Sequence, residues 1–262
     1  MYIKEVFFGG TKVSESDFYK KRGDYIKFKN GVQCIIPEDK DMRLFKDEIL
    51  DIVLPLYCSQ EFDFQKIEEY LDEGPYELNK NVSVNKGDVV FDLGANMGVF
   101  SATIAERAER IYAFEPSSII VEKYLKKMKE YYKNIDVQAY ALSDKRGKTV
   151  FSYNVNNIGA SHMGSNVKEQ CIEEEVLLIS MDEFIEEKHI RKVDFIKADI
   201  EGAERDMLKG AKRVLREFAP KLSICTYHLP DDKEVLEKLI LEANSKYRIE
   251  HKYKKLYAYV PS

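Results

Sequence analysis

The chain has 262 residues and a formal net charge of −5, from 41 basic and 46 acidic side chains. Hydrophobic residues make up 44% of it and charged residues 33%, which supplies enough apolar material for a buried core and excludes a disordered chain. Because basic and acidic residues are interleaved throughout, no electropositive footprint for a phosphate backbone is present, and we expect no nucleic acid partner.

The cysteines and the apolar stretches indicate where in the cell the protein is expected. Four cysteines stand far apart, and the N-terminus lacks the basic-then-apolar layout of a signal peptide, so we expect reduced thiols in a cytoplasmic protein. The apolar stretch at residues 49–57 is interrupted by Asp51 and Pro55. It is shorter than the roughly 20 residues of a membrane span, and we expect no membrane association.

The first part of the chain has its own pattern. Residues 1–36 are rich in aromatic and β-branched residues with turn signals, the strongest at Asn30-Gly31, which predicts short strands and hairpins. Apolar residues at helical spacing over residues 41–73 predict two helices. We therefore divide the chain into an N-terminal extension, residues 1–80, and a main domain, residues 81–262. We expect the extension to cap the site or to form homo-oligomer contacts.

From Val89 onward, short apolar runs alternate with amphipathic stretches. The runs predict strands at Val89–Leu93, Ile111–Phe114, Val137–Tyr140, Phe195–Ala198 and Leu222–Tyr227. The amphipathic stretches predict helices at Phe100–Arg107, Ile119–Tyr132, Arg205–Arg216 and Lys233–Ser245. Strands separated by helices indicate an α/β, doubly wound, Rossmann-like domain whose largely parallel sheet is covered on both faces.

Two further regions complete the prediction. Between the sheet elements, strands at Phe151–Val155 and Val176–Ile179 accompany a loop at residues 154–165 that is rich in Gly, Ser and Asn. The chain ends in two strands, Tyr247–His251 and Leu256–Val260, joined by a charged turn.

The segment most informative about function is the buried strand that runs into the turn Gly94-Ala95-Asn96-Met97-Gly98. At the carboxyl end of such a strand, glycines and the N-terminus of the following helix let a ligand approach the backbone. Glu115 follows Gly94 by 21 residues and ends the next predicted strand. An acidic side chain there accepts hydrogen bonds from both hydroxyls of a ribose. The two features together predict a nucleoside site.

The glycine spacing distinguishes between two nucleoside ligands. A pyrophosphate site uses Gly-x-Gly-x-x-Gly, whereas Asn96 stands here in place of the second glycine. Asp92 would repel a dianionic ligand but could hold the ammonium of a methionine moiety, directly or through water. S-adenosylmethionine is therefore favoured over NAD. A NAD-dependent oxidoreductase and a non-catalytic cofactor- or partner-binding member of the fold are the alternatives.

At these residues the chain resembles the FkbM family of methyltransferases. The resemblance runs from Val89 to Tyr227 and is carried by Asp92–Gly98, Phe114-Glu115-Pro116, Ala141-Leu142-Ser143-Asp144 and Phe195–Glu204. It implies a seven-stranded sheet whose last strand is antiparallel, S-adenosylmethionine as cofactor, and methyl transfer to a hydroxyl of a small molecule or sugar.

The resemblance also implies the residues that bind the cofactor. The residues that would line the methionine half of the cofactor are Asp92, Gly94, Ala95, Asn96 and Gly98. Glu115, beside Pro116, would bind the ribose. The adenine edge would contact Ala141, Leu142 and Ser143. An ordinary exit from a strand explains residues 141–144 equally well.

Methyl transfer to an alcohol needs a base, because the hydroxyl loses its proton during the transfer. Asp199 ends one predicted strand and His228 follows a neighbouring one, so both reach the crevice at the carboxyl edge. We predict His228 as the base, with Asp199 orienting it or the cofactor and Glu201 as the alternative base. A turn residue is the competing interpretation of His228. No metal is expected, although Asp199, Glu201 and His228 would be the ligands of a divalent cation that clamped the acceptor. Glu204 is expected to stabilise a helix N-terminus.

Overall fold

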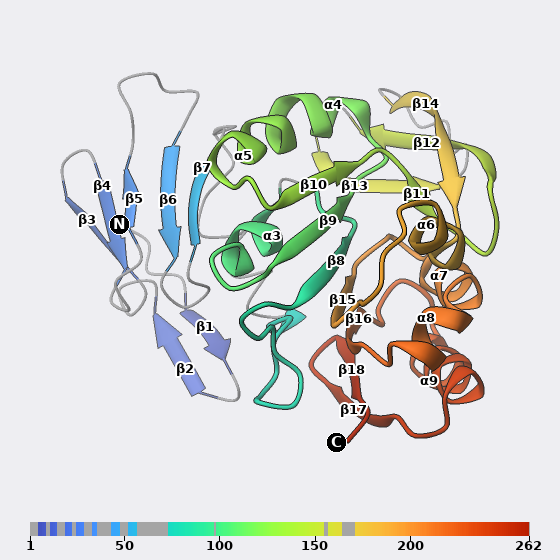
Figure 1. Ribbon diagram of the computed structural model, residues 1–262. Helices are drawn as coiled ribbons and strands as arrows, with labels where there is room; N and C mark the ends of the chain where they lie inside the picture. The colour runs from blue at the N-terminus through green and yellow to red at the C-terminus, as the bar shows by residue number, and fades with distance from the viewer. Residues whose placement is uncertain are drawn as a thin grey trace.

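The centre of the molecule is a seven-stranded sheet with the order β10-β9-β8-β15-β16-β18-β17 (Figure 1). The computed structural model describes the strands between residues 5 and 56, and residues 73–96, 98–154, 157–163 and 171–261. The sheet strands are β8 (Val89–Leu93), β9 (Arg110–Phe114), β10 (Ile135–Gln138), β15 (Phe195–Ala198), β16 (Lys221–Cys225), β17 (Arg248–Lys252) and β18 (Lys255–Tyr259). Strands β8, β9, β10, β15 and β16 pair in parallel, and β18 is antiparallel to β16. The predicted seven-stranded sheet with an antiparallel last strand is confirmed.

Helices cover both faces of this sheet (Figure 1). Because successive side chains of a strand point to opposite faces, Val90 packs in a cluster with Phe100, whereas Phe91 packs in another cluster with Phe184. The first face carries α3 (Val99–Ile104), α4 (Ser118–Ile120), the π-helical turn η1 (Val121–Leu125) and α5 (Lys126–Tyr131). The second carries α6 (Met181–Glu187), α7 (Glu204–Lys209), α8 (Lys212–Glu217) and α9 (Asp232–Ala243). This is the predicted doubly wound arrangement.

Two helical details differ from the prediction. The helix expected over residues 205–216 is divided into α7 and α8 at Gly210, where a Cβ would stand 2.2 Å from the carbonyl oxygen of Ser143. Helix α6 was not predicted, although Ser180 and Glu183 form a capping box at its start. The pattern Ser-x-x-Glu was a readable signal for that helix.

A second, four-stranded sheet has the order β11-β14-β12-β13. Its strands are β11 (Ala141–Leu142), β12 (Gly147–Asn154), β13 (Asn157–Met163) and β14 (Cys171–Ile179). The predicted loop at residues 154–165 is wrong for residues 157–163, which form β13 antiparallel to β12. Backbone pairing with β12 makes a strand of a segment whose composition is typical of a loop.

The N-terminal extension consists of strands where the structure describes it. β1 (Glu5–Phe8) and β2 (Thr11–Ser14) form a hairpin. A five-stranded antiparallel sheet contains β3 (Tyr19–Arg22), β4 (Tyr25–Phe28), β5 (Gln33–Ile35), β6 (Arg43–Asp47) and β7 (Ile52–Leu56). The predicted hairpin around Asn30-Gly31 is confirmed, since β4 and β5 flank it and pair antiparallel.

The first of the two helices predicted over residues 41–73 is wrong, because β6 and β7 occupy this region. Pro55 disfavours a helix interior, and it lies in β7, which is an edge strand of its sheet. A proline is tolerated on a sheet edge, where no partner needs its missing N–H. Residues 57–72, the remainder of the helical prediction, lie outside the described residues. No helix within the described ranges is both long enough and apolar enough to cross a bilayer.

Candidate active site at the carboxyl edge of the sheet

The turn that follows β8 is held against both neighbouring strands. Gly94 has φ +71°, and a Cβ on it would stand 1.9 Å from the carbonyl oxygen of Asp199, at the end of β15. The backbone N–H groups of Gly94 and Ala95 donate to the carbonyl of Phe114, at 3.1 and 2.8 Å. Only glycine fits position 94. The turn therefore lies at the edge of the sheet where the carboxyl ends of β8, β9 and β15 meet.

Glu115 lies at the end of β9 and faces this turn. Its Oε2 accepts from the N–H of Asn96 and its Oε1 from the N–H of Ser117, both at 2.9 Å. The residue is buried, and burial outweighs these hydrogen bonds and raises the pKa of Glu115 to about 7. A carboxylate oxygen has two lone pairs, so each oxygen can accept one further hydrogen bond.

Asp92 is fully buried beneath the turn. Ser101 Oγ donates to its Oδ2 at 2.6 Å, and the Nζ of Lys197 is 3.1 Å from its Oδ1. Lys197 Nζ also donates to the carbonyls of Leu93 and Gly94, at 3.2 and 2.6 Å. Burial opposes the charge on Lys197, but the carboxylates of Asp92 and Asp199 outweigh it and raise the Lys197 pKa. The ammonium of Lys197 therefore contacts both the Asp92 carboxylate and the backbone carbonyls of the turn.

Asp199 lies at the end of β15 and is bound by two tyrosines. Tyr76 donates its hydroxyl to Oδ2 at 2.7 Å, and Tyr227 donates to Oδ1 at 3.2 Å. The ammonium groups of Lys197 and Lys255 lie 5.1 and 4.5 Å from the centroid of the Tyr76 ring. Burial opposes ionisation of Asp199, but Lys197, the Tyr76 hydrogen bond and His228 together hold its pKa below the usual value.

His228 is surrounded by carboxylates. Its Nδ1 is 3.1 Å from Oε1 of Glu204, and its Nε2 is 3.6 Å from both Oδ1 of Asp199 and Oε2 of Glu201. Burial would lower the pKa of His228, but Glu204, Asp199 and Glu201 raise it to about 9. Glu201 has φ +55°, in the left-handed region. Burial raises the pKa of Glu201 to about 7, where Asp199 and Glu204 add to the shift and His228 opposes it.

The structure therefore brings Asp199, Glu201 and His228 together, at the edge where Gly94 also lies. Glu204, which begins α7, adds a third carboxylate. Asp199, Glu204 and His228 each offer a ligand atom within 4.8 Å of the others, and these are the residues that could hold a cation.

The remaining predicted cofactor residues lie at two places. Ala141 and Leu142 form β11 in the smaller sheet and are buried, as is Ser143, whose N–H donates to the carbonyl of Ile179. Both a strand exit and an adenine edge are compatible with this placement. Pro116 is partly buried beside Glu115. Gly98 begins α3, and Met97 lies outside the described residues.

Three site residues were missed by the sequence analysis: Tyr76, Lys197 and Tyr227. A signal existed for Lys197, because a lysine inside the apolar run of a buried strand needs a buried partner. No local pattern marks either tyrosine.

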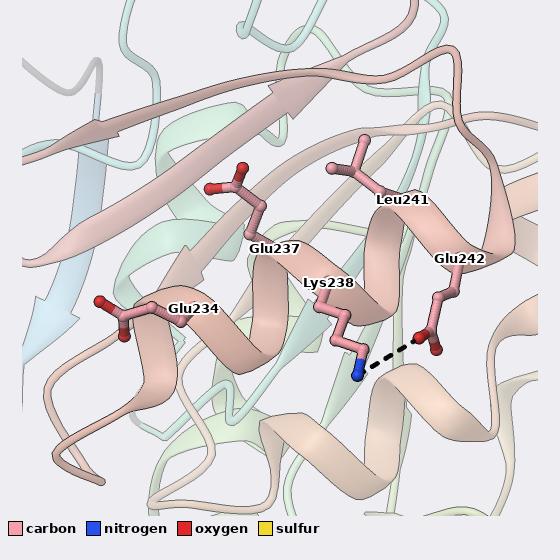
Figure 2. Close-up of a pocket in the computed structure, with 5 residues that line it drawn as sticks. All are labelled: Glu234, Glu237, Lys238, Leu241 and Glu242. Atoms are coloured by element: carbon pink, nitrogen blue, oxygen red, sulfur yellow. Dashed lines mark ion pairs between the residues drawn. The ribbon is translucent and has the colours of Figure 1, made fainter.

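A groove elsewhere on the surface does not belong to this site. It runs along α9 and contains the ion pair between Lys238 and Glu242 (Figure 2). It is lined by Glu234, Glu237, Lys238, Leu241 and Glu242. None of these residues contributes to the crevice at the carboxyl edge.

Comparisons with known proteins agree with the geometry. The family model described as "Methyltransferase FkbM domain" matches residues 92–252. The hexuronic acid methyltransferase AglP of Haloferax volcanii is 26% identical over 156 residues, which are 60% of this chain and 62% of AglP. The AMB antimetabolite synthetase AmbE of Pseudomonas aeruginosa is 25% identical over 159 residues, but the match spans only 8% of AmbE. The chain thus spans less than two thirds of either relative.

A solved structure supports the fold. The crystal structure of the methyltransferase FkbM from Methylobacillus flagellatus KT is similar at a TM-score of 0.50 and 23% identity. The similarity covers 66% of this chain and 43% of that one.

Proposed function

Because the chain belongs to the FkbM methyltransferase family, we propose that it transfers a methyl group from S-adenosylmethionine to a hydroxyl of a small molecule or sugar. The observation that carries the proposal is the buried carboxylate of Glu115, oriented by the N–H groups of Asn96 and Ser117. Its two remaining acceptor positions suit the two hydroxyls of a ribose.

The residues around the glycine turn fit the rest of the cofactor. We assign the methionine half to the turn at Gly94, Ala95, Asn96 and Gly98, and the adenine to the side of Ala141, Leu142 and Ser143. Asp92 lies beneath the turn, where its oxygens contact Ser101 and Lys197 and its side chain is fully buried. Its role is to fix the turn electrostatically rather than to touch the ammonium of the methionine.

The bound cofactor supplies an activated methyl group and a thioether leaving group. That methyl group would pass from its sulfur to the acceptor oxygen, and the hydroxyl proton would pass to a base that the protein supplies. We assign the base to Glu201, whose side chain is 38% exposed, whereas that of His228 is 8% exposed. His228, whose Nε2 is 3.6 Å from Oε2 of Glu201, positions this carboxylate, and Asp199 contacts the same ring nitrogen. The remaining task of the protein is to align the acceptor, which can account for a large part of the rate.

The name of AglP makes hexuronic acids and their glycosides the first acceptors to test. A sugar acceptor also suits the aromatic surface of Tyr227, which is 40% exposed beside Asp199. Transfer is measured as the gain of one methyl group by mass spectrometry, together with release of S-adenosylhomocysteine.

The decisive experiment is titration calorimetry with S-adenosylmethionine and with NAD. We expect saturable binding of the first and none of the second. Glu115→Ala should weaken binding at least about 10-fold, the loss expected for removing a charged hydrogen-bond acceptor. Glu109→Ala is the matched control, since Glu109 immediately precedes β9 and its side chain makes an exposed ion pair with Lys192. Binding of NAD would favour the oxidoreductase alternative. Absence of S-adenosylmethionine binding would leave the non-catalytic alternative.

A further inference from the structure

We propose that Asp199, Glu204 and His228 form a binding site for one divalent cation beside the cofactor crevice. One ligand atom from each lies within 4.8 Å of the other two. Three atoms at this separation lie within about 2.8 Å of a common centre, so shifts of about half an ångström would bring them to cation bond lengths of roughly 2.1–2.3 Å. Side-chain rotations alone can supply shifts of this size.

Two residues of this cluster have buried polar atoms without hydrogen-bond partners. Glu204 is completely buried, and its Oε2 has no hydrogen-bond partner among the described residues, while its Oε1 accepts from the N–H of Ile200 at 2.9 Å. Neither ring nitrogen of His228, which is 8% exposed at its side chain, makes a hydrogen bond within the same part of the chain. Buried polar atoms without partners are costly. A cation bound to the Glu204 carboxylate and to one ring nitrogen of His228 would remove part of that cost.

One contact of the His228 ring has a distance that suits two ligands of the same ion. Oε1 of Glu204 is close to Nδ1 of His228, at 3.1 Å, yet the pair lacks the alignment of a hydrogen bond. Two ligand atoms bound at right angles to one ion at about 2.2 Å are about 3.1 Å apart. Only one ring nitrogen of His228 can bind the ion, and the other nitrogen lies on the opposite side of the ring; the contact from Nε2 to Asp199 Oδ1, at 3.6 Å, is too long for a hydrogen bond.

The local charge favours a cation as well. The carboxylates of Asp199, Glu201 and Glu204 all approach His228 within 3.6 Å. The buried Lys197 contacts Asp92, and the buried Lys255 donates to the backbone carbonyls of Glu73 and Gly74. A singly charged imidazolium leaves an excess of negative charge in a buried cluster, which is unfavourable. A divalent cation offsets it.

One imidazole nitrogen and two carboxylates form an oxygen-rich set that suits Mn²⁺. The exposed Glu201 marks the open side of the cluster, where further coordination positions would face the crevice. An acceptor oxygen could occupy one of them, and this last step rests on the proposed function. The cation site itself does not depend on it.

Mn²⁺ binding to the purified chain, followed by the loss of the free-ion electron paramagnetic resonance signal, tests the proposal. We expect one Mn²⁺ per chain in the wild type, and an affinity at least about 10-fold lower in Glu204→Gln and in His228→Gln. S-adenosylhomocysteine binding, measured on the same samples, verifies that each variant is folded.

His251→Gln is the matched control, because His251 forms an exposed pair with Glu237 at 2.7 Å. It should bind Mn²⁺ like the wild type. The proposal is overturned if the wild type binds no Mn²⁺, if His228→Gln binds it equally well, or if His251→Gln loses as much affinity. Cofactor binding without Mn²⁺ binding refutes the cation site alone. Mn²⁺ binding without cofactor binding refutes the proposed function alone.

Discussion

The proposed contact between Glu115 and the ribose predicts that cofactor affinity depends on pH. Burial raises this pKa to about 7 in the free protein, and only the ionised carboxylate can accept hydrogen bonds from both ribose hydroxyls through all its lone pairs. The apparent dissociation constant is then the intrinsic one divided by the ionised fraction of Glu115. That fraction is about 0.09 at pH 6 and about 0.9 at pH 8, so S-adenosylhomocysteine should bind about 10-fold more tightly at pH 8.

Titration calorimetry from pH 6 to pH 8.5, in two buffers of different ionisation enthalpy, measures this dependence. Because the ligand favours the ionised form, binding near pH 7 should release about half a proton. Glu115→Gln should bind weakly with no pH dependence, whereas Glu109→Gln should behave like the wild type. Equal affinities at pH 6 and pH 8, or the same pH dependence in Glu115→Gln, would refute the assignment of Glu115 as the ionised ribose acceptor.

Two further outcomes concern stability, and a third concerns cofactor binding. Without cofactor, the pKa of Glu115 is about 7 in the folded chain and 4.5 when unfolded. Because the buried acid must ionise as pH rises from 4.5 to 7, its contribution to the free energy of unfolding falls by about 3 kcal/mol over that range. Comparing urea unfolding of wild type and Glu115→Gln across the range should show this difference. Lys197→Met leaves the buried carboxylate of Asp92 without its cation, and urea unfolding should show a loss of about 3–5 kcal/mol that Asp92→Asn partly restores in the double variant. Gly94→Ala places a Cβ 1.9 Å from the carbonyl oxygen of Asp199 at φ +71°; the turn must move, so calorimetry should show no cofactor binding even where circular dichroism shows a folded chain.

The sequence by itself determined the main sheet and the meeting of the glycine turn with Glu115. Strands such as Val89–Leu93 and Phe195–Ala198 are short apolar runs bounded by turns, and this pattern is local. The spacing from Gly94 to Glu115 follows from one strand, one helix and the next strand, and the two ends meet because parallel strands finish at the same edge. The N-terminal extension was harder to predict. The apolar spacing over residues 41–56 fits a helix, but this segment forms the strands β6 and β7, which pair with each other.

The tertiary structure alone decided how the polar residues combine. Tyr76 is 123 residues from Asp199 in the chain and donates to it, and Lys197 on β15 contacts Asp92, its partner on the neighbouring strand β8. Glu204 looks like a helix-terminal residue in the sequence, yet its buried carboxylate lies against His228. Burial and the charges of distant neighbours set the ionisation of such groups. Neither quantity is a property of a local stretch of sequence, so both appear only when the chain is folded.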